Sequence, residues 1–182
     1  PRPYSLVLSY ANPHRPLLLA GENPAFPGHA DPNLDTPERY RLLVEMLDQE
    51  IGRLQETLTK LGDNTVVVFV SDHGAPQDFQ GNGNFNGGKG NLYEGGIRVP
   101  AFIYWPQKVK PLTVTRVVHS LDLYPSLLHL ADGEVDDMPG RVLLDQHGNY
   151  QAGEPQKYAW TFGRVRASRD GNWKAIFIPA KQ

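Results

Sequence analysis

The four residues Ser71-Asp72-His73-Gly74 place a carboxylate next to an imidazole at the end of an apolar run. In open α/β sheets, ligands bind beyond the carboxyl ends of the strands. A carboxylate held rigidly at the tip of a buried strand is suited to binding a metal ion. The local alternative, about equally favoured by these residues alone, is that Asp72 caps the turn before Gly74.

A second candidate is Lys89, which lies in the glycine-rich segment 87–100. Glycines permit positive φ and close backbone approach, so a lysine among them can reach an anion. The segment is not a P-loop, because the Gly-x-x-x-x-Gly-Lys-Ser/Thr spacing is absent. Taken singly, Lys89 is a solvated loop lysine and His14 a turn histidine. Glu94 and Arg98 of the segment are predicted to form an ion pair that braces the loop.

The clearest element is a helix predicted over residues 37–61. Asp35 and Thr36 are capping candidates, Pro37 suits the first turn, and Gly62 is typical of a helix end. Apolar residues recur at steps of three and four and predict one apolar face, made of Tyr40, Leu43, Val44, Leu47, Ile51, Leu54, Leu58 and Leu61.

Strands are predicted over residues 5–10, 65–70 and 101–105, and a second helix over 121–131 with Asp122 placed at its start. The run 65–70 is β-branched without alternation, which is typical of a strand buried on both faces in a parallel sheet. Helices that alternate with buried strands predict an α/β fold.

Beyond residue 140 the character of the chain changes. Residues 158–164 and 173–178 predict antiparallel strands joined by the turn at Asp170-Gly171. We therefore predict one domain over residues 1–140 and the start of a small C-terminal subdomain over 141–182.

In order and spacing, these segments resemble the sulfatase family of the alkaline phosphatase superfamily. The resemblance covers nearly the whole chain, and its most specific part is residues 89–100 joined to 71–74. It implies a mixed, mainly parallel sheet flanked by helices. Residues 1–140 would then be the C-terminal half of the catalytic domain, followed by a truncated subdomain. Other matching segments are Pro13-His14-Arg15-Pro16, 119–128 and 170–174.

Sulfatases hydrolyse sulfate esters with a formylglycine nucleophile and a divalent metal, usually Ca²⁺. The resemblance implies that Asp72 and His73 lie on the metal side, and that Lys89 and His14 contact the sulfate and the leaving-group oxygen as catalytic and substrate-binding residues. A cation and an ammonium stabilise the sulfuryl group in flight, and a histidine can protonate the departing alkoxide. Because imidazole suits Mn²⁺ or Zn²⁺ better than Ca²⁺, two alternatives stay open: the metal is Mn²⁺ rather than Ca²⁺, or His73 contacts the sulfate rather than the metal.

Formylglycine is made in a Cys/Ser-x-Pro-x-Arg motif, and the chain contains neither this motif nor any cysteine. The resemblance therefore implies an internal or C-terminal fragment that lacks the nucleophile-bearing half. We predict that the chain alone is inactive, since no covalent route remains. An unpaired sheet edge and an uncovered apolar face also predict self-association.

Composition excludes two classes of partner. The formal net charge of −2 comes with no basic stripe, which argues against nucleic acid, and no run of apolar residues is long enough to span a membrane. The expected partner is a sulfated small molecule or glycan. By family habit the protein would be periplasmic or secreted. The alternatives are a phosphonate or phosphate-ester hydrolase of the same superfamily, and a non-catalytic module that binds a sulfated ligand.

Overall fold

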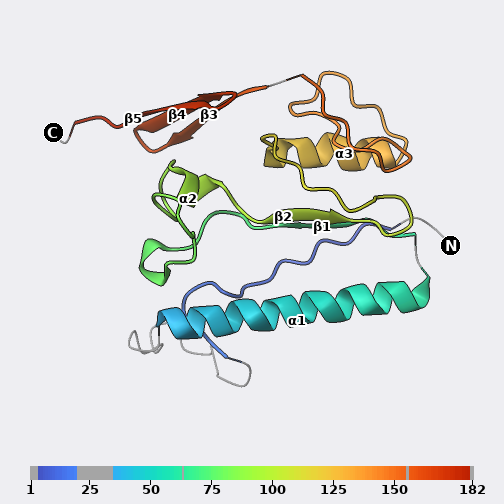
Figure 1. Cartoon of the computed structure of the whole chain (residues 1–182), viewed down its shortest axis with the longest axis horizontal. Helices are drawn as coiled ribbons and strands as arrows, with labels where there is room; N and C mark the ends of the chain where they lie inside the picture. The colour runs from blue at the N-terminus through green and yellow to red at the C-terminus, as the bar shows by residue number, and fades with distance from the viewer. Residues whose placement is uncertain (1–3, 20–34, 63, 155, 181–182) are drawn as a thin grey trace. The chain divides into compact units, whose positions relative to one another are not determined.

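The computed structural model describes residues 4–19, 35–62, 64–154 and 156–180 (Figure 1). The chain forms two compact units. The first takes in Pro1–Asp63 and Ala75–Gly81, and the second takes in Asn64–Gly74 and Asn82–Gln182. Both helices and sheets are present, which confirms the α/β class. The predicted boundary at residue 140 stays a prediction.

Helix α1, Pro37–Leu61, confirms the longest predicted element. Thr36 is its N-cap, and the Oγ1 of Thr36 accepts a hydrogen bond from the Arg39 amide at 3.2 Å. Gly62 ends the helix in the left-handed region at φ 67°, where an L side chain is disfavoured. Asp35, the other capping candidate, instead accepts a hydrogen bond from the Leu17 amide at 3.0 Å.

The core of the first unit lies where α1 meets two other segments. Leu43 from α1, Leu17, and Phe79 from the 3₁₀ helix η2 (Gln77–Phe79) are all buried. The ring of Tyr40 stacks on Phe79 with 4.8 Å between centroids. Each fully buried leucine contributes about 1.5–3 kcal/mol, so this small cluster is what attaches residues 75–81 to the helix.

The strand predicted over residues 5–10 is not formed. These residues are extended and exposed, and Val7 keeps 84% of its surface. A strand requires a hydrogen-bonded neighbour, and residues 5–10 pair with no other strand in the described part of the chain. An apolar run predicts the preference for an extended backbone but not the partner.

In the second unit, strand β1 (Val67–Val70) pairs with β2 (Ala101–Tyr104). Both predicted strands are confirmed, each slightly shorter than expected. The pair is antiparallel, with Val67 opposite Tyr104, so the expected parallel arrangement is wrong for these two strands. The chain leaves β1, folds over residues 71–100 and enters β2 from the same end, whereas a parallel neighbour requires a crossover to the opposite end. β1 is also only partly buried.

The helix predicted over residues 121–131 is confirmed as α3, Leu123–Leu130. It is preceded by a 3₁₀ turn, η3, Ser120–Asp122. The Gly133 amide donates to the Leu128 carbonyl at 2.9 Å and closes the C-terminal end. None of the helices in the described ranges is both long and apolar enough to cross a membrane.

The C-terminal sheet is antiparallel, as predicted, but it has three strands rather than two (Figure 1). They are β3 (Lys157–Phe162), β4 (Val165–Asp170) and β5 (Trp173–Phe177), in that order. The turn at Asp170-Gly171 therefore joins β4 to β5. β4 was missed because its sequence, Val-Arg-Ala-Ser-Arg-Asp, is mostly polar, and only Ala167 in it is buried.

Candidate active site

Asp72 and His73 lie directly after β1, and their side chains meet. The Ser71 amide still donates to the Pro100 carbonyl at 3.1 Å, so the ladder with β2 extends to the edge of the site. The Nε2 atom of His73 is 3.1 Å from Oδ2 of Asp72, and its Nδ1 atom is 3.0 Å from the Gly74 carbonyl oxygen. Asp72 Oδ1 accepts from the His73 amide at 2.9 Å, the local turn contact that the sequence left open.

These contacts suit a shared cation. A metal-binding histidine usually donates its other ring N–H to a backbone carbonyl or a carboxylate, and Nδ1 of His73 faces the Gly74 carbonyl. With the ring proton on Nδ1, the lone pair of Nε2 would lie beside Asp72 Oδ2, and these two atoms could then hold one cation. The Asp72 side chain is 80% exposed and accessible to an ion.

The two donors do not make a whole metal site. Ca²⁺ takes about six to eight oxygen ligands, and no group of three or more metal-binding side chains occurs within the described ranges. Asp72 and His73 therefore fit a divalent metal as part of a larger ligand set.

The glycine-rich loop folds against this strand tip through its backbone. The Gly74 amide donates to the Gly96 carbonyl at 3.0 Å, and the Gly95 amide donates to the Asn86 carbonyl at 2.8 Å. A Cβ atom on Gly74 would lie 1.7 Å from the Gly95 carbonyl oxygen, and one on Gly95 would lie 2.3 Å from the Gly87 carbonyl oxygen. Real Cβ atoms do not approach backbone this closely, so these positions require glycine.

Lys89 lies at an exposed turn of the same loop. It is flanked by Gly87 at φ 80° and Gly90 at φ 88°, both in the region that only glycine adopts readily. The Asn91 amide donates to the Gly88 carbonyl at 3.2 Å and closes the turn. The second unit thus brings the Asp72-His73 segment and the loop of Lys89 together.

His14 lies in the first unit, on an exposed turn in which its amide donates to the Ala11 carbonyl at 2.8 Å. Its neighbour Arg15 forms an ion pair with Asp35 at 3.1 Å and a hydrogen bond with Asp78. That hydrogen bond lowers the pKa of Asp78. The guanidinium also lies 4.3 Å from the centroid of the Phe79 ring. Arg15 therefore fastens the turn of His14 to its own unit, and the role of His14 stays a prediction.

The predicted ion pair between Glu94 and Arg98 is not formed. The guanidinium of Arg98 lies 4.6 Å over the ring of Phe85. Glu94 is instead paired with Arg169 at 3.3 Å and Lys174 at 2.8 Å. Sequence reasoning missed these partners because they are 75 and 80 residues away; the only signal was Lys174 in the family-like segment 170–174.

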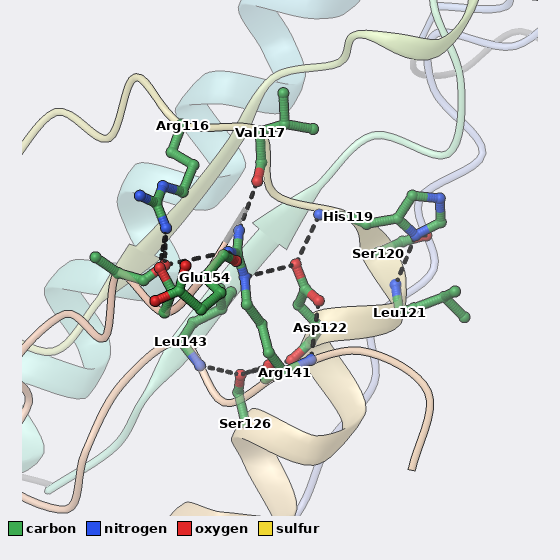
Figure 2. A network of polar contacts seen from close by, with 12 residues as sticks. Arg116, Val117, His119, Ser120, Leu121, Asp122, Ser126, Arg141, Leu143 and Glu154 are labelled. Carbon is green, nitrogen blue, oxygen red and sulfur yellow. Dashed lines mark hydrogen bonds and ion pairs between the residues drawn. The ribbon is translucent and has the colours of Figure 1, made fainter. Parts of the chain in front are cut away.

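Asp122 is fully buried at the start of α3, and Figure 2 shows its polar contacts there. Its carboxylate accepts hydrogen bonds from the amides of His119 at 2.9 Å and Arg141 at 3.0 Å. Ser126, one turn later, donates to the Asp122 carbonyl at 2.5 Å and accepts from the Leu143 amide at 2.8 Å. Asp122 is therefore a residue that places the helix, as the sequence predicted.

The second unit thus has a carboxylate and an imidazole at a strand tip, and the glycine-rich loop that carries Lys89 contacts this tip through Gly95 and Gly96. Comparison with known proteins identifies the class. The sulfatase family model matches residues 1–133, nearly three quarters of the chain. The chain belongs to the sulfatase family, whose members are by class sulfuric ester hydrolases.

Several curated relatives support the same assignment. The chain is 32% identical over 166 residues to the uncharacterized sulfatase YdeN of Escherichia coli, covering 86% of this chain and 29% of that protein. It is 36% identical over 156 residues to mouse steryl-sulfatase, covering 79% and 23%. It is 31% identical over 141 residues to mouse arylsulfatase J, covering 75% and 23%. The chain thus spans less than a third of the length of each of these relatives.

Proposed function

We propose that this chain is part of an enzyme that hydrolyses sulfate esters. Lys89 would contact the sulfate, and Asp72 and His73 would contribute ligands to a divalent metal, Ca²⁺ or Mn²⁺. The observation that carries the proposal is the backbone contact of Gly74 with Gly95 and Gly96, because it holds the loop of the lysine against the strand tip of the two metal-side residues.

The residues of this chain would act mainly through charge. The sulfuryl group carries negative charge as it is transferred, and the ammonium of Lys89 would stabilise that charge without having to reorganise. His14 would donate its proton to the ester oxygen as the alkoxide departs. A bound divalent metal supplies further positive charge at the sulfuryl oxygens. The nucleophile, a formylglycine, would come from outside this sequence.

The direct test is a titration of the isotope-labelled 182-residue chain with inorganic sulfate, followed by amide NMR. We expect the amides of residues 88–90 to shift, and Lys89→Met to abolish the shift, since the ammonium carries the charge that binds the anion. Lys110→Met, at an exposed lysine of the same unit, is the matched control and should bind sulfate with the same affinity as the wild-type chain. The chain should not hydrolyse 4-nitrophenyl sulfate, because its sequence contains no Cys/Ser-x-Pro-x-Arg motif from which a formylglycine could be made.

Other outcomes would point elsewhere. Shifts that survive Lys89→Met would contradict the assigned role of the lysine. Tighter binding of inorganic phosphate than of sulfate would favour a phosphate-ester or phosphonate hydrolase. Turnover of the aryl sulfate by the chain would overturn its predicted inactivity. Binding without turnover is also what a non-catalytic module would show, so an activity assay on a protein that joins these residues to a Cys/Ser-x-Pro-x-Arg motif is what separates the two.

The metal ligands can be tested with Mn²⁺, which broadens the NMR signals of nearby nuclei. We expect broadening centred on residues 71–74, with Asp72→Asn weakening Mn²⁺ binding by at least about tenfold, the smaller end of what loss of even an indirect partner costs. Asp136→Asn, at an exposed aspartate of the same unit, is the control. Broadening that persists unchanged in Asp72→Asn would remove Asp72 from the ligand set.

Self-association and a sulfated small molecule or glycan as partner remain part of the proposal. β1 and β2 form a two-stranded sheet, so each strand has one edge that no strand of the described ranges covers. Such edges favour pairing with another chain.

A further inference from the structure

The glycine-rich loop is tied to the C-terminal sheet by one carboxylate. The Nζ atom of Lys174 donates to Oε1 of Glu94 at 2.8 Å, and the Nη1 atom of Arg169 lies 3.3 Å from both carboxylate oxygens. All three side chains are mostly buried, with exposed fractions of 28% for Glu94, 19% for Arg169 and 12% for Lys174. Ion pairs at such sites are screened by water far less than pairs on the surface.

The sheet places the two cations so that they require an anion. Arg169 on β4 and Lys174 on β5 are directly opposite each other in the antiparallel register, and like charges in that position destabilise a sheet. The carboxylate of Glu94 contacts both and offsets their repulsion. This face of the sheet is therefore a receptor for a single carboxylate, and the loop supplies it.

Glu94 directly precedes the two glycines through which the loop contacts the strand tip. It is the first residue of the short helix α2, Glu94–Ile97. The next two residues, Gly95 and Gly96, make the backbone contacts with Asn86 and Gly74. Holding the side chain of Glu94 thus fixes the point at which the loop of Lys89 meets the strand tip of Asp72 and His73.

The sheet is itself fastened to the rest of the second unit. The indole Nε1 of Trp160 donates to Nε2 of His119 at 3.2 Å, and Tyr158 stacks on the His119 ring at 5.3 Å. His119 is bonded through its own amide to the buried Asp122 (Figure 2). Lys174 lies 5.6 Å over the ring of Trp160. A series of contacts therefore runs from α3 through the sheet to Glu94.

We propose that the C-terminal sheet is a brace for the active-site loop, and that Glu94, Arg169 and Lys174 are positioning residues that hold Lys89 in place to bind sulfate. The inference rests on the proposed function for the role of Lys89, whereas the brace itself is a property of the fold. None of the three residues is assigned a contact with substrate.

The brace is tested by hydrogen exchange on the 182-residue chain. We expect Glu94→Gln and Lys174→Met to speed amide exchange over residues 86–97 by about tenfold to a hundredfold, as loss of a hydrogen bond between charged groups implies. Lys174→Arg keeps the cation and should restore most of the protection. Lys157→Met breaks the exposed 2.8 Å pair with Asp170 in the same sheet and is the matched control that should change nothing in the loop.

The pH dependence gives a second readout. Burial alone would raise the pKa of Glu94, but the hydrogen bond and charge of Lys174 and the charge of Arg169 outweigh it, so the pKa is lowered. A lowered pKa means that the stabilisation is complete above the ordinary pKa of a glutamate and is lost as the pH falls through the folded-state value. The free energy of unfolding of the wild-type chain should therefore fall as the pH drops below the ordinary pKa of a glutamate. Glu94→Gln, which cannot be protonated there, should not show this fall.

The exchange results test the brace, and the sulfate-binding results test the role of Lys89. Unchanged exchange over residues 86–97 in both Glu94→Gln and Lys174→Met overturns the brace, as does Lys174→Arg behaving like Lys174→Met. Sulfate binding weakened by Glu94→Gln in parallel with loop exchange supports the positioning of Lys89. If the unchanged chain binds no sulfate while the exchange results hold, the brace stands and the proposed role of Lys89 falls.

Discussion

Replacing Asp122 by alanine will destabilise the second unit by about 3–5 kcal/mol, the usual cost of removing one partner of a buried ion pair. The amides of His119 and Arg141 would lose their acceptor inside the protein. The Nε atom of Arg141, 3.7 Å from Asp122 Oδ2, makes no hydrogen bond of its own and would lose its only nearby opposite charge among the ion pairs described. A loss of this size is a large fraction of the stability of an ordinary domain.

Urea unfolding followed by tryptophan fluorescence measures this loss directly. All three tryptophans lie in the second unit, so the signal reports the unit that contains Asp122. Asp122→Asn keeps the side-chain shape and one oxygen acceptor. Its free energy of unfolding should therefore lie between those of the wild-type chain and Asp122→Ala. Asp136→Ala, at an exposed aspartate, is the control, and its free energy of unfolding should stay within about 0.5 kcal/mol of the wild-type value. If the free energy of unfolding of Asp122→Ala also lay within about 0.5 kcal/mol of the wild-type value, the prediction would be contradicted.

Gly74→Ala will separate the two halves of the candidate site. The added methyl group would lie 1.7 Å from the carbonyl oxygen of Gly95, and backbone cannot yield as a flexible side chain does. Overpacking of this kind costs about 1–3 kcal/mol, and here the simplest relief is movement of the loop. We expect loss of the hydrogen bond from the Gly74 amide to Gly96, and weaker binding of both sulfate and Mn²⁺.

Hydrogen exchange at residues 74 and 96, together with the two binding titrations, checks this expectation. Gly52→Ala in α1 is the matched control, because nothing lies within 4 Å of its added methyl group. It should raise stability by about 0.5–1 kcal/mol, since glycine inside a helix is less favourable than alanine. Gly74→Ala with sulfate and Mn²⁺ affinities equal to those of the unchanged chain would show that the contact does not hold the site together.

The features predicted correctly are those that depend on residues close together in the sequence. The caps of α1, Thr36 and Gly62, act within one turn of the helix, so the sequence alone located both ends. The runs that became β1 and β2 were recognised from their side chains. The glycines of segment 87–100 were predicted to permit close backbone approach, and Gly95 and Gly96 do so: an added Cβ atom would lie 2.3 Å and 2.2 Å from a backbone oxygen.

The features that were missed depend on partners. The antiparallel pairing of β1 with β2, the absence of a strand over residues 5–10, and the central position of β4 all follow from which segments meet. A run such as Val-Arg-Ala-Ser-Arg-Asp becomes a strand because two neighbours supply its hydrogen bonds, not because its composition demands it.

The sequence by itself therefore determined the family, the types of the chemically active residues and the elements on which they lie. Only the tertiary structure decided what those residues touch. Glu94 has an arginine four positions away but pairs with two cations that are 75 and 80 residues distant. The register of β4 and β5 sets those cations opposite each other. Charge attraction depends on distance in space, and distance in space is a property of the folded chain.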